Sequence, residues 1–120
     1  MLYSERLEHV ISLALSALRQ ERVFQPFRAG VEVSWLYGKA GGGPAAAFLR
    51  YAPGARIPRH RHEGFEHIFV LDGSQQDAHG VYPAGTLIVN QPGTDHEVAS
   101  PEGCLVLVIW GQHVVFLDDA

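Results

Sequence analysis

The sequence is poor in cysteine and lysine, and it has no long apolar run. Its 120 residues include one cysteine, Cys104, which excludes an intramolecular disulfide. No stretch reaches the roughly 20 apolar residues that a transmembrane helix needs. The N-terminus does not read as a secretory signal, because Glu5, Arg6 and Glu8 interrupt its apolar positions. We therefore expect a cytoplasmic protein without a membrane partner.

Positive charge is also scarce. Lys39 is the one lysine, beside eight scattered arginines, and the formal net charge is −4 with a pI near 5.9. A nucleic-acid binder shows a basic patch or stripe, and this chain has none, so we expect no nucleic-acid partner. Hydrophobic residues make up 47% and charged residues 18% of the chain, which fits one globular domain with a buried core.

The first 25 residues are predicted to form a helix and a lead-in. Between residues 4 and 22 apolar side chains recur at three- and four-residue intervals, as on the buried face of an amphipathic helix: Leu7, Val10, Ile11, Ala14, Leu15 and Leu18. Ser4 can cap the N-terminus of this helix. We expect the helix to pack on the rest of the domain or to pair in a dimer, and a partner-binding arm is the alternative.

From residue 26 onward the pattern changes, and residues 26–120 are predicted to form one all-β domain. The segment 31–37 alternates between two faces, and further apolar runs follow at 47–51, 68–71, 86–90 and 104–110. Turn-forming pairs separate them, among them Pro53-Gly54, Asp72-Gly73 and Pro92-Gly93. Short strands at this spacing predict an antiparallel sandwich or barrel.

The candidate site lies in the segment 58–70, which reads PRHRHEGFEHIFV. Residues i and i+2 of a strand point to the same face, so His60 and His62 project together. Residues 63–65 are few enough to turn the chain back into the sheet at Glu66. There Glu66 shares a face with Ile68 and Val70, which indicates the barrel interior.

A carboxylate in such a place costs free energy unless it is paired or bound to a cation. Two neutral imidazoles would offset little of that cost, whereas a divalent metal ion would use all three side chains. A further histidine follows Pro92-Gly93 at the start of another strand and can enter the same cavity. We therefore predict one divalent metal ion held by four residues: His60, His62, Glu66 and His96.

These residues resemble the two sequence motifs of the cupin superfamily. The first motif (Gly, five residues, His-x-His, three or four residues, Glu, six residues, Gly) is matched at every position: Gly54, His60, His62, Glu66 and Gly73. The second motif (Gly, five residues, Pro-x-Gly, two residues, His, three residues, Asn) is matched at Gly85, Gly93 and His96, with Gln91 and Ser100 in the places of its Pro and its Asn. The resemblance covers roughly residues 26–117. It implies an RmlC-like jelly-roll antiparallel β-barrel in which the same four residues bind a metal.

A narrower resemblance is carried by the segments FLRYAPG at 48–54, GVYPAG at 80–85 and Gly103-Cys104. They are similar to the cupin domain of ChrR-like anti-sigma factors and its single-domain relatives. In that family the four residues bind zinc, and several relatives are iron-dependent dioxygenases. Full anti-sigma factors add a helical domain with its own His and Cys zinc ligands, whereas the segment before the predicted barrel has one histidine, His9, and no cysteine. Binding of a sigma factor is therefore not expected.

The resemblance implies two candidate functions. The first is a metal-dependent dioxygenase that cleaves a carbon–carbon bond in a small diketone or hydroxyketone bound in the barrel, with Glu66 as a candidate base. The second is a non-catalytic zinc cupin that acts as a sensor or regulator, and a metal-free isomerase is a more distant third. Zn²⁺ or Fe²⁺ is the expected ion, with Mn²⁺ or Ni²⁺ as alternatives. A homodimer is the expected assembly.

The remaining polar candidates are expected to be structural or solvated. The other histidines of the predicted all-β domain point to the opposite face or lie near turns: His67, His79 and His113. Cys104 begins an apolar strand, as an inert buried thiol does. Arg50 and Arg59 are expected in solvent at the rim, and contact with an anionic substrate is the alternative for them.

Overall fold

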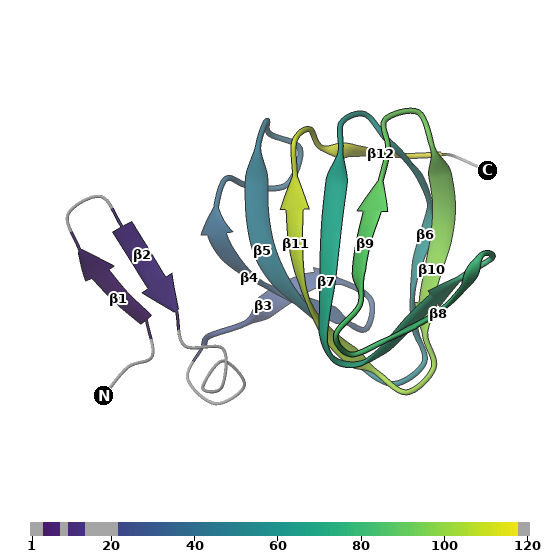
Figure 1. The fold of residues 1–120 in the computed structure, drawn as a ribbon, viewed down its shortest axis with the longest axis horizontal. Helices are drawn as coiled ribbons and strands as arrows, with labels where there is room; N and C mark the ends of the chain where they lie inside the picture. The colour runs from purple at the N-terminus through teal and green to yellow at the C-terminus, as the bar shows by residue number, and fades with distance from the viewer. Residues whose placement is uncertain (1–3, 8–9, 14–21, 118–120) are drawn as a thin grey trace.

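The structure is a computed structural model that describes residues 4–7, 10–13 and 22–117. Ten strands of these residues build one curled antiparallel sheet (Figure 1): β3 (Gln25–Arg28), β4 (Val31–Tyr37), β5 (Ala45–Tyr51), β6 (Ala55–His62), β7 (Glu66–Asp77), β8 (Gly80–Pro83), β9 (Leu87–Asn90), β10 (Asp95–Ser100), β11 (Cys104–Trp110) and β12 (Val114–Phe116). Their hydrogen-bonded order is β12-β6-β10-β7-β11-β5-β4-β3, and β8 and β9 both pair with β7. The sheet is a half-barrel, which confirms the all-β antiparallel prediction.

The predicted N-terminal helix over residues 4–22 is wrong where the structure describes this segment. Ser4–Leu7 (β1) and Val10–Leu13 (β2) form a separate two-stranded antiparallel sheet, and residue 22 is not helical. Residues 14–21 lie outside the described residues. Four-residue segments are too short to separate a period of 3.6 from strict alternation, and β-branched Val10 and Ile11 favour a strand. The described residues include no helix long and apolar enough to cross a membrane.

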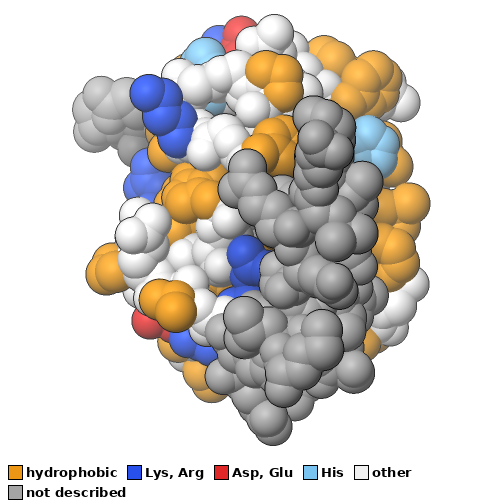
Figure 2. All heavy atoms as spheres, turned by 90° about the vertical axis from the view of Figure 1, so that its left-hand side faces the viewer, with side chains coloured by type: hydrophobic (Ala, Val, Ile, Leu, Met, Phe, Trp, Pro, Cys, Tyr) orange, Lys and Arg blue, Asp and Glu red, His pale blue; other side chains and the backbone are white. Residues whose placement is uncertain are grey.

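The main core lies inside the curl of the sheet. Alternate residues of β4, β5, β7 and β11 point inward and are buried, among them Val31, Val33, Leu49, Val70, Val106 and Val108. A smaller cluster covers the outer face of β5 and β11, where Phe48 and Leu105 are buried. Burial on both faces explains why these two strands read as continuous apolar runs. Figure 2 shows one outer side of the molecule, where apolar and basic side chains are interspersed beside few visible acidic ones.

A β-bulge interrupts the alternation of β6 just before the candidate site. In the pairing of β6 with β10, Ile57 lies opposite Val98 but His60 lies opposite His96, so β6 contains one extra residue between them. Ile57 and His60 consequently both face inward although they are three residues apart. Bulges commonly re-aim side chains next to active sites, and this one turns the His-x-His pair into the core.

A second bulge divides β7. Its first half pairs with β11 and β9, and its register against β11 shifts so that Leu71 is the extra residue. Gly73 follows with φ +74°, and a Cβ at this position would overlap the carbonyl oxygen of Gly103, so only glycine fits. Because of the extra residue, Glu66 near one end and Asp77 at the other both have buried side chains, despite their odd separation along the strand.

Candidate metal centre

The four residues predicted as ligands meet inside the curl. Three strands contribute the side chains. β6 supplies His60 and His62, β7 supplies its first residue, Glu66, and β10 supplies its second residue, His96. One nitrogen or carboxylate oxygen from each residue lies within 4.8 Å of the others, and all four residues are buried: His60, His62, Glu66 and His96. The structure therefore brings together every residue of the predicted set.

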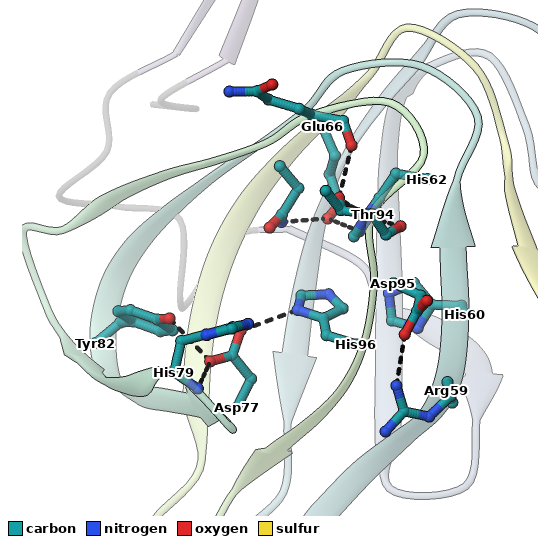
Figure 3. Close-up of polar contacts among 12 residues, drawn as sticks. Arg59, His60, His62, Glu66, Asp77, His79, Tyr82, Thr94, Asp95 and His96 are labelled. Carbon is teal, nitrogen blue, oxygen red and sulfur yellow. Dashed lines mark hydrogen bonds and ion pairs between the residues drawn. The ribbon is translucent and has the colours of Figure 1, made fainter.

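The outer nitrogen of each histidine ring lies beside an oxygen that accepts hydrogen bonds, as Figure 3 shows for His62 and His96. The Nδ1 contacts are His60 with the Pro58 carbonyl at 2.8 Å, His62 with the Thr94 carbonyl at 3.0 Å, and His96 with Asp77 Oδ2 at 3.0 Å. Carbonyl and ionised carboxylate oxygens only accept, so Nδ1 carries the hydrogen in all three rings. In the neutral ring, Nε2 is then left with a free lone pair.

The inner nitrogens lack a donor to pair with. Nε2 of His62 and Nε2 of His96 are buried and have no hydrogen-bond partner, and the former lies 3.0 Å from Glu66 Oε1. Two acceptor atoms at this distance need a proton or a cation between them. Three imidazole nitrogens and one carboxylate oxygen are a donor set that Zn²⁺ and the first-row transition metals bind well. The cluster could therefore hold one metal ion.

Glu66 is fixed by both strands next to it. Trp110 lies opposite it on β11 and donates from Nε1 to Oε2 at 2.7 Å, and Asn90 lies opposite it on β9 and donates from Nδ2 to Oε1 at 2.9 Å. Burial raises the pKa of Glu66, but the nearby His62 and His60 and the Trp110 hydrogen bond outweigh burial and lower this pKa below its ordinary value. The carboxylate is therefore ionised at neutral pH.

The two histidines of β6 have pKa values shifted in opposite directions. Burial lowers the pKa of His60 by more than the Pro58 carbonyl and Glu66 raise it. Burial also lowers the pKa of His62, but the adjacent Glu66, with smaller contributions from Thr94, outweighs it and the net pKa is raised. At neutral pH His60 is thus already in the neutral form that binds metal. A larger fraction of His62 is protonated, and that proton must leave when a metal binds.

Asp77 supports the cluster from behind His96 (Figure 3). Besides the His96 ring it accepts hydrogen bonds from the backbone nitrogen of His79 and from the hydroxyl of Tyr82, each at 2.8 Å. These bonds lower the pKa of Asp77 despite the opposing effect of burial, while burial and the carboxylate raise the pKa of Tyr82 to about 12. A carboxylate in this position orients a ligand histidine.

The sequence reasoning missed the residues that support the four predicted ligands. These are Asp77, Asn90, Thr94 and Trp110. Strict alternation from Glu66 places Asp77 on the outer face of β7, and only the bulge reverses this. The turn before His96 is the one signal that could have pointed to Thr94.

A small cavity of about 40 Å³ adjoins the cluster. Three of the four cluster residues line it, and its other walls are largely apolar, including Phe27, Ile68, Val108 and Phe116. Since a water molecule needs roughly 10–15 Å³ of such space, this inner chamber admits about three water-sized groups. The cluster is thus open to a small ligand on one side.

The other predicted positions lie away from the cluster. His67, His79 and His113 are exposed, and Cys104 is buried in β11 with its thiol pKa raised by burial. Arg50 forms an ion pair with Glu32 at 2.7 Å, and Arg59 forms one with Asp95 at 2.5 Å. Both arginines therefore form ion pairs at the surface.

Together, the curled sheet and its buried cluster of three histidines and one glutamate define a cupin. The chain belongs to the ChrR cupin-like domain family, whose family model matches residues 16–114. The family predicted from the sequence motifs is thereby confirmed.

Solved structures share this fold at low sequence identity. An acetylacetone dioxygenase from Acinetobacter johnsonii is 16% identical with a TM-score of 0.75, covering 96% of this chain and 81% of its own. The anti-sigma ChrR in complex with SigE from Rhodobacter sphaeroides gives 24% identity and a TM-score of 0.68, covering 76% of this chain and 50% of the other. At these identities the likeness establishes an RmlC-like cupin fold and not an activity.

Among curated proteins, the candidate dimethylsulfoniopropionate lyase DddL of Cereibacter sphaeroides is 31% identical over 68 residues. The match covers 52% of this chain, and it spans 29% of the length of that relative.

Proposed function

We propose that this cupin is a metal-dependent dioxygenase that cleaves a carbon–carbon bond in a small β-diketone or 2-hydroxyketone. The observation that carries the proposal is the pair of unpartnered Nε2 atoms of His62 and His96 beside an ionised Glu66, next to a chamber with largely apolar walls. The likeness to an acetylacetone dioxygenase supports the same substrate class. Fe²⁺ is the ion that this proposal requires.

The proposed reaction balances without a second reductant. One O₂ and one β-diketone give one carboxylic acid and one 2-oxoaldehyde, so both oxygen atoms enter the products. When bound, the ion supplies Lewis-acid polarisation of the two carbonyl oxygens and the redox chemistry that dioxygen requires. The chain itself must supply a base, a fixed orientation for that base and a dry chamber.

Glu66 meets the first requirement. It is ionised and lines the inner chamber, so it can accept the proton from the carbon between the two carbonyl groups. The hydrogen bonds from Trp110 and Asn90 hold its carboxylate in place from two strands. The rest of the chamber wall is largely apolar, so a substrate that displaces water from the chamber strengthens the electrostatic interactions within it.

Oxygen uptake tests the proposal directly. The protein is purified anaerobically without an affinity tag, its metal content is measured, and the iron-loaded form is mixed with a series of β-diketones and 2-hydroxyketones under an oxygen electrode. We expect near-stoichiometric iron and uptake of one O₂ for each substrate consumed. Iron-loaded protein that consumes no oxygen with any of these compounds would overturn the proposal.

A non-catalytic zinc-binding regulator is the second candidate function. It is favoured by the membership of the ChrR cupin-like domain family and by a donor set of four groups, which suffices for a closed tetrahedral zinc site. For this candidate we expect stoichiometric zinc that resists chelation, together with no oxygen uptake after iron loading. Zinc that a chelator removes within minutes would count against a closed site.

A further inference from the structure

A second cavity lies directly outside the inner chamber. It has a volume of about 70 Å³ and shares four lining residues with the chamber: Phe27, Trp110, Val114 and Phe116. Its remaining wall comes mostly from the loop between β4 and β5, together with Trp35 and His113. We call this second cavity the vestibule; it adjoins the chamber that Glu66 and His96 line.

The vestibule is apolar but not neutral. Its lining includes Lys39, the one lysine of the chain, and His113, and it includes no acidic side chain. A turn in which the Gly42 nitrogen donates to the Lys39 carbonyl at 3.2 Å fixes the backbone of the lysine at the rim. A ligand in the vestibule therefore meets a positive charge on one side and aromatic rings on the other.

Lys39 differs from the other basic side chains that the structure describes. Four arginines form ion pairs with carboxylates: Arg50, Arg56, Arg59 and Arg61. Arg22 donates to Ser34 Oγ at 2.7 Å, and the guanidinium of Arg28 lies 3.5 Å from the centre of the Phe116 ring. Lys39 has neither a carboxylate nor a ring partner within the described part of the chain, so its ammonium group is free to bind an anion.

We propose that Lys39 binds a carboxylate of the substrate, which makes the substrate a small dicarbonyl acid. Its anionic end would lie in the vestibule, and its two carbonyl groups would lie in the inner chamber beside the cluster. This inference rests on the proposed dioxygenase function and specifies its substrate class. A neutral diketone satisfies the cluster but leaves Lys39 unpaired.

The two volumes limit the size of such a substrate. At roughly 10–15 Å³ for each water-sized group, the chamber and the vestibule hold about three and about five groups respectively. A five-carbon diketo acid is of this size. 2,4-Dioxopentanoate and its neutral relative pentane-2,4-dione therefore form a matched pair of probes that differ in the carboxylate.

The test uses the full-length chain loaded with Co²⁺, whose visible absorption responds to a ligand near the ion and does not depend on turnover. Both probes are titrated into the wild type and into Lys39→Gln, Lys39→Arg and Arg56→Gln. Arg56→Gln is the matched control, because it also removes one exposed positive charge but does so from a surface ion pair with Glu97. A hydrogen bond between charged groups accounts for about a ten-fold change in affinity.

We expect the wild type to bind 2,4-dioxopentanoate about ten-fold more tightly than pentane-2,4-dione. Lys39→Gln should abolish that preference and leave the affinity for pentane-2,4-dione unchanged. Lys39→Arg should retain most of the preference for 2,4-dioxopentanoate, and Arg56→Gln should retain all of it. If Lys39→Gln lowers the affinity for both probes equally, or changes the affinity for neither, the role of Lys39 is overturned and the dioxygenase proposal stands. A wild-type cobalt spectrum that responds to neither probe instead overturns the diketone class, and with it this inference.

Discussion

Trp110 and Glu66 lie opposite each other in the β11–β7 ladder, and the indole nitrogen donates a 2.7 Å hydrogen bond to the carboxylate. The bond links the candidate metal centre to the wall of the vestibule, because Trp110 also lines both cavities. A substitution at Trp110 should therefore change metal binding at the cluster.

Trp110→Phe should weaken metal binding by about ten-fold. An aromatic ring is retained, although it is smaller than the indole. Glu66 loses one of its two hydrogen-bond donors, so the pKa of Glu66 rises. The measurement is a competition titration of Zn²⁺ with a chromophoric chelator. Trp35→Phe is the matched control, since its ring lies 6.0 Å from Trp110 and donates no hydrogen bond to Glu66. Equal losses in the two variants would contradict the role of the indole nitrogen.

Glu66→Ala and His60→Ala should each lose metal occupancy and the metal-dependent part of the thermal stability. A metal present at 100 times its Kd stabilises the folded state by about 2.7 kcal/mol, and a variant that does not bind it lacks this contribution. Thermal melts with and without chelator, combined with elemental analysis, measure both quantities. Glu63→Gln, an exposed carboxylate in an ion pair with Arg61, serves as the control. A double variant that melts like the wild type under both conditions would place the site elsewhere.

Asp77→Asn should lower the affinity for metal by about 10- to 100-fold, because His96 loses the carboxylate that orients its ring. The same substitution removes a charge next to Tyr82, so the pKa of Tyr82 should fall from about 12 towards its ordinary value of 10. Tyrosinate absorbance during a pH titration reports this second effect. Glu97→Gln, on the outer face of the same region, should change neither quantity.

Metal-dependent stabilisation should increase with pH between 6 and 8. In the metal-free protein the raised pKa of His62 contributes stability that is present below 6.5 and is lost as the pH rises through the folded-state pKa. The lowered pKa of Glu66 contributes stability that is present above 4.5 and is lost as the pH falls through its folded-state pKa. Protons and metal thus compete at His62, and a chelator should lower the Tm more at pH 8 than at pH 6. A chelator effect that is independent of pH would exclude His62 as a ligand.

Gly73→Ala should destabilise the fold by more than about 3 kcal/mol, because the new Cβ would overlap the Gly103 carbonyl and the backbone has φ +74°. Gly85→Ala is the matched control, with φ +93° and no atom within 4 Å of the new Cβ. It should cost about 1 kcal/mol, from the left-handed conformation alone. Urea unfolding curves compare the two. Similar losses would mean that conformation rather than contact requires glycine at position 73.

The sequence predicted the cluster because its ligand residues follow local rules. His60 and His62 share a face by simple alternation, and Glu66 returns after a short turn. Asp77 depends instead on an extra residue in β7 whose presence is visible only in the pairing of β7 with β11. Asn90 and Trp110 reach Glu66 through strand register, which a single sequence does not specify.

The N-terminal error has a different physical origin. Leu7, Val10 and Ile11 satisfy helical spacing, yet in the described segments they belong to two four-residue strands that pair with each other. Local pattern over so few residues is a weak determinant of secondary structure, and cross-strand pairing decides the outcome.

The extra residue at Leu71 also makes the length of β7 a determinant of the site. Before it the strand pairs with β11 and β9. After it, Asp72 and Gly73 still pair with β11, and the remaining residues pair with β8 and β10. Deleting one residue here would turn Gln75 and Asp77 outward while leaving Glu66 inside, without changing a single ligand. A relative whose β7 is one residue shorter between Glu66 and Asp77 would therefore keep the four ligand residues but lose the carboxylate that contacts His96. Chain length, as much as residue identity, decides whether the site is complete.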